Sequence, residues 1–277
     1  MSDDHVYLSL AEGHDDGSDA RWAFGTGFED PLHGVDTAVP ESVDAAGLAA
    51  QCLALGDDAL VLAQRLAEWI TLAPELEEEV ALANIGLDLL GQARLLYARC
   101  GQADGTSRTE DAYAYFRDAD DFRNVRLVEL PNGDFAFSVL RLLVFACWRL
   151  AHFTELATSP DPVLAAIAAK GVNELAYHRQ YAAEWVVRLG DGTEESHARM
   201  LTALESQAPY WEELFAAEDV RDAVRADLRQ VLDAAGLPVP HTAPLPGDGR
   251  DGEHTEYLAP LLAELQSVAR AHPEATW

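Results

Sequence analysis

Apolar residues recur along most of the chain at alternating spacings of three and four, which is the period of an amphipathic helix. The first such run begins after residue 42 and predicts one helical face made of Leu48, Cys52, Leu55, Ala59, Leu62, Leu66 and Trp69. Pro74 opens a second helix, whose first turn is rich in glutamate, as the helix dipole favours. We expect this second helix to end at Gly101 and to bury Leu76, Val80, Ala83, Leu87, Leu90 and Tyr97.

Two more long helices are predicted in the middle of the chain. The turn Pro131-Asn-Gly-Asp134 supplies an N-cap for a strongly apolar helix over residues 135–157. Ser159-Pro-Asp-Pro162 ends that helix and starts a fourth, which carries His178 on its apolar face and stops at Gly190-Asp-Gly192. Shorter helical patterns cover residues 109–118, 194–217, 220–235 and 255–271, with a Pro- and Gly-rich loop at 238–252.

These elements predict an all-α fold, because no segment has a convincing strand pattern. Long helices joined by short turns, with one long link at residues 101–133, are typical of a ferritin-like four-helix bundle. Additional C-terminal helices are expected to pack around it. Residues 1–41 are acidic, Gly-rich and aperiodic, so we expect a loosely ordered N-terminal extension before a helical domain at 42–277.

Charge narrows the possible functions. The 277 residues include 19 Lys+Arg against 48 Asp+Glu, a net charge of −29, which argues against nucleic-acid or anionic-membrane partners. Lys170 is the only lysine, and this acidic composition is typical of a halophile's cytoplasmic protein. We expect a cytoplasmic protein, since the N-terminus has no signal-peptide pattern and no apolar run is long enough to span a membrane. The three isolated cysteines, Cys52, Cys100 and Cys147, predict no disulfide framework.

Ferritin-like bundles can build di-iron sites from a Glu on each of two helices and Glu-x-x-His on the other two. The second helix offers Asp88-Leu-Leu-Gly91, with glycine where histidine is needed. The fourth offers Glu174-Leu-Ala-Tyr-His178, with Tyr177 at the histidine position. The middle of the third helix has no acidic residue, and its polar members are Arg141 and Arg149. The first helix offers Asp57, Asp58, Gln64 and Glu68 as possible ligands.

This set does not make a complete di-iron site, so the sequence predicts no catalytic, cofactor or metal residues. We interpret Glu174 and His178 as a buried hydrogen-bonded pair, and Asp88 as a buried acid paired with a helix arginine. His152 is interpreted as a core or groove histidine. Two alternatives stay open: a metal-binding ferritin-like oxidase using Asp57, Asp88, Glu174 and His178, or a free-standing helical binding module.

Several motifs, in order over residues 53–277, resemble one family. They are Leu55-Gly-Asp-Asp58, Leu66-Ala-Glu-Trp69 with Ala73-Pro-Glu-Leu76, Asn84 to Arg94, Leu127-Val-Glu-Leu-Pro-Asn-Gly-Asp-Phe135, Glu174 to His178, Leu189 to Thr193, and His254 to Gln266 with the closing Trp277. The family that they resemble is the structural C subunit of phenylacetyl-CoA epoxidase (PaaC family).

The resemblance implies a role in phenylacetate catabolism. In that complex a homologous A subunit holds the di-iron cofactor and epoxidises the aromatic ring of phenylacetyl-CoA, with a small B subunit and a separate reductase as further components. The C subunit is implied to share the fold, to lack a working site, and to pair with and stabilise the A subunit. Asp57, Asp88, Glu174 and His178 are then former-site positions, which we expect to form an internal salt-bridge and hydrogen-bond network.

Overall fold

The computed structural model describes residues 32–215 and 218–275. Most of the expected N-terminal extension, residues 1–31, lies outside the described residues. The helices belong to one compact unit that begins at Asp36. Within the described residues the secondary structure is helical and contains no strand, which confirms the predicted all-α class.

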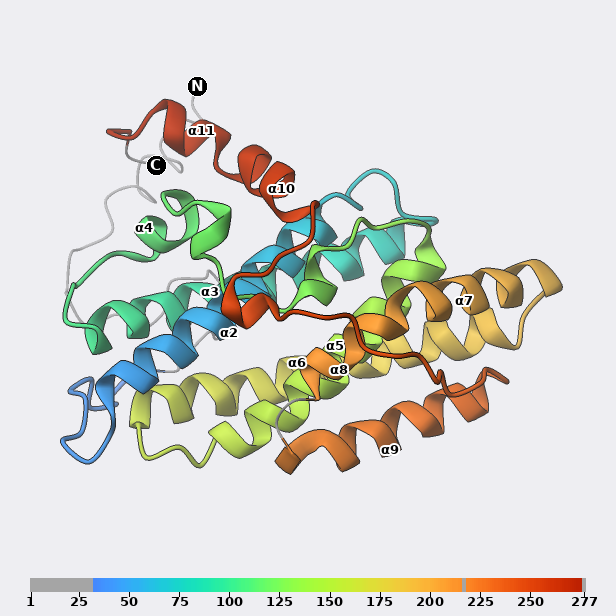
Figure 1. Cartoon of the computed structure of the whole chain (residues 1–277), viewed down its shortest axis with the longest axis horizontal. Helices are drawn as coiled ribbons and strands as arrows, with labels where there is room; N and C mark the ends of the chain where they lie inside the picture. Colours follow the sequence, from blue (N-terminus) through green and yellow to red (C-terminus); the bar gives the residue numbers. More distant parts are fainter. Residues whose placement is uncertain (1–31, 216–217, 276–277) are drawn as a thin grey trace, which may run out of the picture. The chain divides into compact units, whose positions relative to one another are not determined.

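Four long helices form the bundle (Figure 1): α2 (Ala45–Ala67), α3 (Leu76–Ala103), α5 (Phe135–Leu156) and α6 (Pro162–Gly190). α2 pairs with α3, α5 pairs with α6, and α3 also packs against α6. Contacts of Asp88 with His178 and of Gln92 with Glu174 show that α3 and α6 run antiparallel. The predicted face of α2 is confirmed, because its six apolar residues from Leu48 to Leu66 are buried, and Trp69 is buried in the turn that follows the helix.

The helix starts follow from local chemistry. Asp134 and Asp161 cap α5 and α6 by accepting hydrogen bonds from the amides of Phe137 (2.9 Å) and Leu164 (2.8 Å), and Pro162 takes the first turn of α6. Before α5, Gly133 has a φ of 57°, which glycine adopts without the steric cost that a Cβ would add. The predicted N-cap at Asp134 is therefore confirmed.

The predicted end of the second helix at Gly101 is wrong. α3 continues to Ala103, and Gly101 is buried inside it. A Cβ at this position would lie 2.4 Å from the carbonyl oxygen of Arg108, so the glycine permits a close approach of the following loop. The sequence shows a glycine but not which backbone passes beside it.

The remaining elements surround the bundle. The link from α3 to α5 holds α4 (Glu110–Tyr115) and the 3-10 helices η1 (Ala119–Asp121) and η2 (Arg126–Glu129). After α6 come α7 (Glu194–Gln207), η3 (Ala208–Tyr210), α8 (Trp211–Leu214), α9 (Glu218–Ala234), η4 (Gly249–Asp251), α10 (Leu258–Leu265) and α11 (Ser267–Ala271). The helix predicted at 194–217 thus ends earlier, and the one predicted at 255–271 is interrupted at Gln266.

α5 is the most apolar of the four long helices, and α6, α7 and α9 cover it. By length and composition alone α2 and α5 could each cross a membrane, but 61% and 72% of their most apolar windows are buried inside the fold. This is the pattern of core helices. Cys52, Cys100 and Cys147 are free and buried, at 0%, 3% and 2% exposure, consistent with small apolar core residues.

The expected buried face of the second helix is partly wrong. Leu76, Val80 and Leu87 are 69%, 52% and 64% exposed. The buried stripe of α3 consists instead of Leu82, Ile85, Leu89, Ala93, Leu96 and Tyr97. α3 carries two apolar stripes on opposite sides, and only its packing against α2 and α6 decides which one is interior.

Candidate functional site

The centre of the bundle holds a buried arginine that contacts two of the other long helices directly and the third through a glutamine. Arg149 of α5 donates from Nε to Gln92 Oε1 of α3 (2.9 Å) and from Nη1 to the Leu55 carbonyl of α2 (3.2 Å). Gln92 in turn donates to Glu174 Oε2 of α6 (2.9 Å). Burial lowers the pKa of Arg149 to about 10, so the guanidinium still carries a positive charge at neutral pH.

The interpretation of Glu174 and His178 as a mutual pair is wrong. Glu174 accepts from Gln92 and forms an ion pair with Lys170, one turn earlier on α6. His178 is fully buried and contacts Asp88 Oδ2 through Nε2 at 3.0 Å. Asp88 therefore pairs with a histidine rather than with an arginine. The Nδ1 atom of His178 is buried without a hydrogen-bond partner.

Asp57 lies in a different cluster, at the junction of α2 with the α3–α5 link. Its carboxylate accepts from the Tyr97 hydroxyl (2.6 Å), the Arg123 amide (2.8 Å) and the Arg117 guanidinium. Arg117 also stacks over the Phe122 ring at 4.1 Å. The neighbouring Gly56 makes this packing possible, because a Cβ there would lie 2.7 Å from the Tyr97 ring.

Asp58 attaches the C-terminal segment to α2. Arg250 donates to both of its carboxylate oxygens (3.0 and 2.7 Å), and the Val125 amide donates to Oδ1 (2.8 Å). Asp58 lies 4.0 Å from Arg149, so it contributes negative charge beside the central arginine. The four residues of Leu55-Gly-Asp-Asp58 thus each have a structural contact that explains them.

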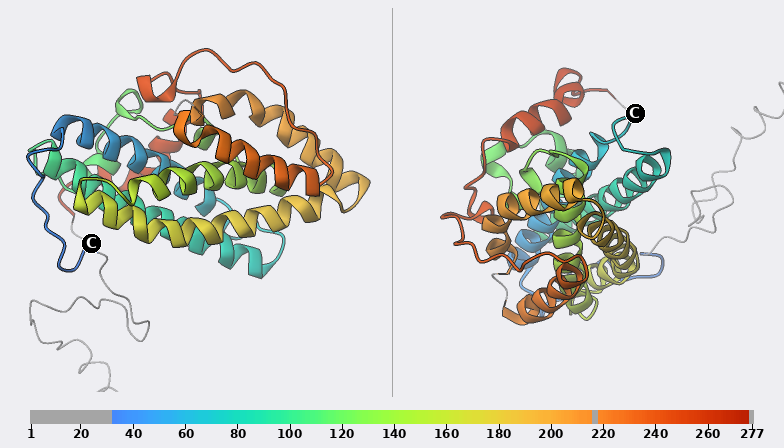
Figure 2. Two further views of the ribbon diagram at one scale, coloured as in Figure 1. Left: turned by 90° about the horizontal axis from the view of Figure 1, so that it is seen from below. Right: turned by 90° about the vertical axis from the view of Figure 1, so that its right-hand side faces the viewer.

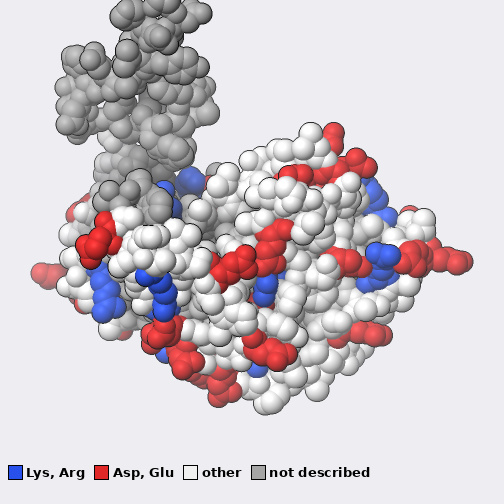
Figure 3. All heavy atoms as spheres, turned by 90° about the horizontal axis from the view of Figure 1, so that it is seen from above, with Lys and Arg blue, Asp and Glu red and all other residues white. Residues whose placement is uncertain are grey.

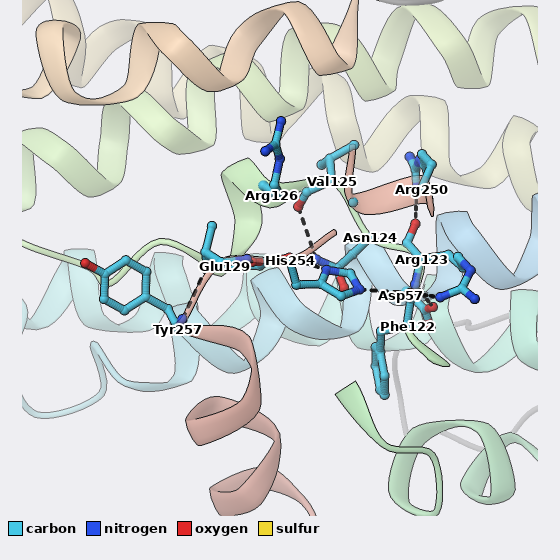
Figure 4. A network of polar contacts seen from close by, with 12 residues as sticks. Asp57, Phe122, Arg123, Asn124, Val125, Arg126, Glu129, Arg250, His254 and Tyr257 are labelled. Atoms are coloured by element: carbon cyan, nitrogen blue, oxygen red, sulfur yellow. Dashed lines mark hydrogen bonds and ion pairs between the residues drawn. The ribbon is translucent and has the colours of Figure 1, made fainter. Parts of the chain in front are cut away.

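A second attachment joins two of the motifs identified in the sequence (Figure 4). Glu129, at 0% exposure, accepts from Asn124 Nδ2 (2.8 Å), the Thr255 amide (2.7 Å) and the Thr255 hydroxyl (2.6 Å). His254 contacts Glu129 Oε1 through Nδ1 (2.7 Å) and the Phe122 carbonyl through Nε2 (2.9 Å). The Leu127–Phe135 motif therefore holds the start of the C-terminal motif.

The two neighbours of His254 define its protonation state. A carboxylate and a carbonyl oxygen are both acceptors, so both ring nitrogens must carry protons and the side chain is an imidazolium. Burial alone lowers the pKa of His254, but the hydrogen bond and charge of Glu129 outweigh burial and raise it. The contact is a buried ion pair in which both Glu129 oxygens are satisfied.

The four former-site positions all make internal hydrogen bonds or ion pairs, as expected, but these contacts fall into separate groups. The hydrogen bonds place Asp57 with Tyr97 and Arg117, and Glu174 with Gln92 and Lys170. Asp88 and His178 form a third contact at the α3–α6 edge. His152, half-buried, stacks on Trp148 at 5.9 Å, and burial followed by the charge of Arg149 lowers its pKa to about 4.

These residues do not fit a di-iron site. Such a site needs several carboxylates and histidines converging on one point, whereas Arg149 places a cation there and Gln92 supplies an amide. Within residues 32–215 and 218–275 no three His, Cys, Asp or Glu side chains are grouped so as to hold a metal ion. An added Cβ at Gly91 would meet nothing within 4 Å, and Tyr177 is 52% exposed, so neither is packed in the core.

Arg149 is predicted from the sequence only as a polar member of an apolar helix, without its partners. Gln92, Glu129 and His254 were not predicted as interacting residues. An arginine inside the most apolar long helix was the available signal, since a buried cation requires acceptors. Glu129 had a similar signal, because it is an acid between the apolar residues that precede the turn.

Comparison with known proteins agrees with the motifs. The pattern of the phenylacetic acid catabolic protein family (PaaA_PaaC) matches residues 35–277. The C subunit of the 1,2-phenylacetyl-CoA epoxidase of Escherichia coli (strain K12) is 41% identical over 246 residues, covering 83% of this chain and 99% of the relative. The family match spans every element of the bundle and the C-terminal attachment. The chain therefore belongs to the phenylacetic acid catabolic protein family and has its ferritin-like, all-α fold.

Proposed function

We propose that this chain is the non-catalytic structural C subunit of a phenylacetyl-CoA epoxidase. The observation that carries the proposal is the central Arg149–Gln92 contact, which fills the bundle interior with a cation and an amide. The similarity to the C subunit of the Escherichia coli epoxidase supports the assignment to the complex. Glu174, Asp88, His178 and Asp57 then stabilise the fold and do not bind metal.

In the proposed complex the di-iron cofactor belongs to a homologous catalytic A subunit, which this chain binds and stabilises. A small B subunit and a reductase complete the assembly. Two properties of this chain support the assignment. Its polar interior is occupied by internal hydrogen bonds, and its large core is built from buried apolar side chains.

The test combines metal content with reconstitution. The full chain is expressed alone with ample iron, and its iron content is expected to be far below one atom per chain. The A subunit of the same host is then purified with and without this chain. Oxygen consumption dependent on phenylacetyl-CoA and the reductase is expected only when both are present.

The competing function is a ferritin-like metal oxidase using Asp57, Asp88, Glu174 and His178. It would require roughly two irons in each chain purified alone, and that result would overturn the structural assignment. Unchanged epoxidation by the A subunit without this chain would also contradict the proposal.

A further inference from the structure

The outer stripe of α3 forms an apolar surface next to α6. Leu76, Val80 and Leu87 follow one another at helical spacings on this stripe. Tyr177 of α6, next to the histidine that contacts Asp88, extends the surface across the α3–α6 edge. Figure 2 shows α3 in teal at the outside of the bundle with α6 in yellow beside it.

The turn before α3 continues this surface. Ile70 and Leu72 are 46% and 69% exposed. The Thr71 amide between them donates to Glu79 Oε1 (3.0 Å), which holds the turn against the first turns of α3. We call the resulting surface the α3–α6 face, made of Ile70, Leu72, Leu76, Val80, Leu87 and Tyr177.

This face concentrates the exposed apolar material of the described chain. The described residues include eleven exposed large apolar side chains, and six of them lie on this face. The other five are spread over the end of α4, the segment 239–257 and α11. Exposed apolar side chains that gather on one face, with polar residues around them, mark an interaction site rather than the scattered apolar exposure of an ordinary surface.

The charge around the face selects the kind of partner. Acidic residues border the face on two sides. The start of α3 carries Glu75, Glu77, Glu78 and Glu79, and the side of the face toward α6 carries Asp88 of α3 and Glu184 of α6. Two basic residues lie near the face, and both are already paired. Arg94, seven residues after Leu87 on the same side of α3, has a 65% exposed side chain and pairs with Glu110, and Lys170, the single lysine, pairs with Glu174. Figure 3 shows another face on which acidic side chains also outnumber basic ones.

A second copy of this chain is therefore a poor occupant, because each copy carries a net charge of −29 and would bring the same acidic rim to the contact. A different helical chain with Arg or Lys around an apolar stripe is complementary in both respects. Helices meet by packing ridges into grooves, and Gly91 leaves open space beside Leu87 for an inserted side chain.

We infer that the α3–α6 face is the surface on which this chain docks the homologous di-iron catalytic subunit of the proposed complex. This inference rests on the proposed function and adds a location to it. The interface would have an apolar centre at Leu87 and Val80, with basic residues of the partner facing the glutamates of the first turn of α3.

The test measures binding of the full chain to the A subunit of the same host, by titration calorimetry and by size-exclusion chromatography. Leu87→Asp and Val80→Asp place a charge in the centre of the face. Val268→Asp is the matched control, because Val268 is 55% exposed on α11, away from the α3–α6 edge. Circular dichroism and thermal melting confirm that each variant folds.

We expect Leu87→Asp and Val80→Asp each to weaken binding at least tenfold, with Val268→Asp unchanged. If wild type binds the A subunit and all three variants bind equally well, this location is wrong while the proposed function stands. If wild type itself does not bind, the proposed function fails and the inference fails with it. A wild-type homodimer that Leu87→Asp dissociates would identify a second copy as the occupant and overturn the inference.

Discussion

Replacing Glu129 with glutamine tests whether a buried ion pair holds the C-terminal segment on the bundle. The side chain keeps its volume but loses its charge, and its new amide group would face donors from Asn124 and Thr255. The one remaining carbonyl oxygen can face either His254 and Asn124 or the two Thr255 donors, so one of these groups loses its acceptor and the charge opposite the imidazolium is removed. Breaking a buried ion pair by removing one partner costs about 3–5 kcal/mol, so we expect about 3 kcal/mol of lost stability.

Urea unfolding at a fixed salt concentration measures this change. The salt is fixed because a chain with a charge of −29 changes stability with ionic strength. Glu256→Gln is the matched control, since Glu256 is exposed two residues from His254. His254→Gln and the double variant complete a cycle in which we expect a coupling energy of about 1–3 kcal/mol. A loss below about 1 kcal/mol for Glu129→Gln would refute the reasoning.

The same pair predicts a direction with pH. The folded pKa of His254 is raised above its ordinary value of about 6.5. Its contribution is therefore fully present below about pH 6.5 and is lost as the pH rises through the folded pKa. The stability difference between wild type and His254→Gln should shrink from pH 6 to pH 9, and a difference that grows over this range would contradict the assignment of an imidazolium.

Three further outcomes are expected. Arg149→Met removes the donor to Gln92 and to the Leu55 carbonyl. The free energy of unfolding measured in urea should fall by about 2–4 kcal/mol. A fall below about 1 kcal/mol would show that the central contact is dispensable. Glu174→Gln should cost about 0.5–1 kcal/mol, because Lys170 and Glu174 are partly exposed, at 31% and 15%. Lys170→Met should cost a similar amount, and unchanged stability in both variants would remove Glu174 from the stabilising contacts. The excess of acidic side chains repels itself, and salt screens this repulsion. The melting temperature of the protein should therefore rise when KCl is increased from about 0.1 to 2 M. A fall in melting temperature would contradict the interpretation as a salt-adapted protein.

The sequence determined the local structure well because the relevant interactions are local. The spacing of apolar residues on α2, the caps Asp134 and Asp161, and the turn at Gly133 depend on residues within one or two turns of each other. The ferritin-like class followed from the number of long helices and the one long link. The burial of Cys52 and Cys147 followed from their positions in apolar helical patterns.

Only the tertiary structure decided which groups meet. α3 has two apolar stripes in its sequence, and packing against α2 and α6 leaves Leu76, Val80 and Leu87 outside. Asp88 meets His178 across 90 positions, and Glu129 meets His254 across 125. Helical periodicity fixes the side of a helix on which a residue lies, but not the neighbour that faces that side. The partners of buried charges come from distant segments, so they are set by the packing of the whole chain.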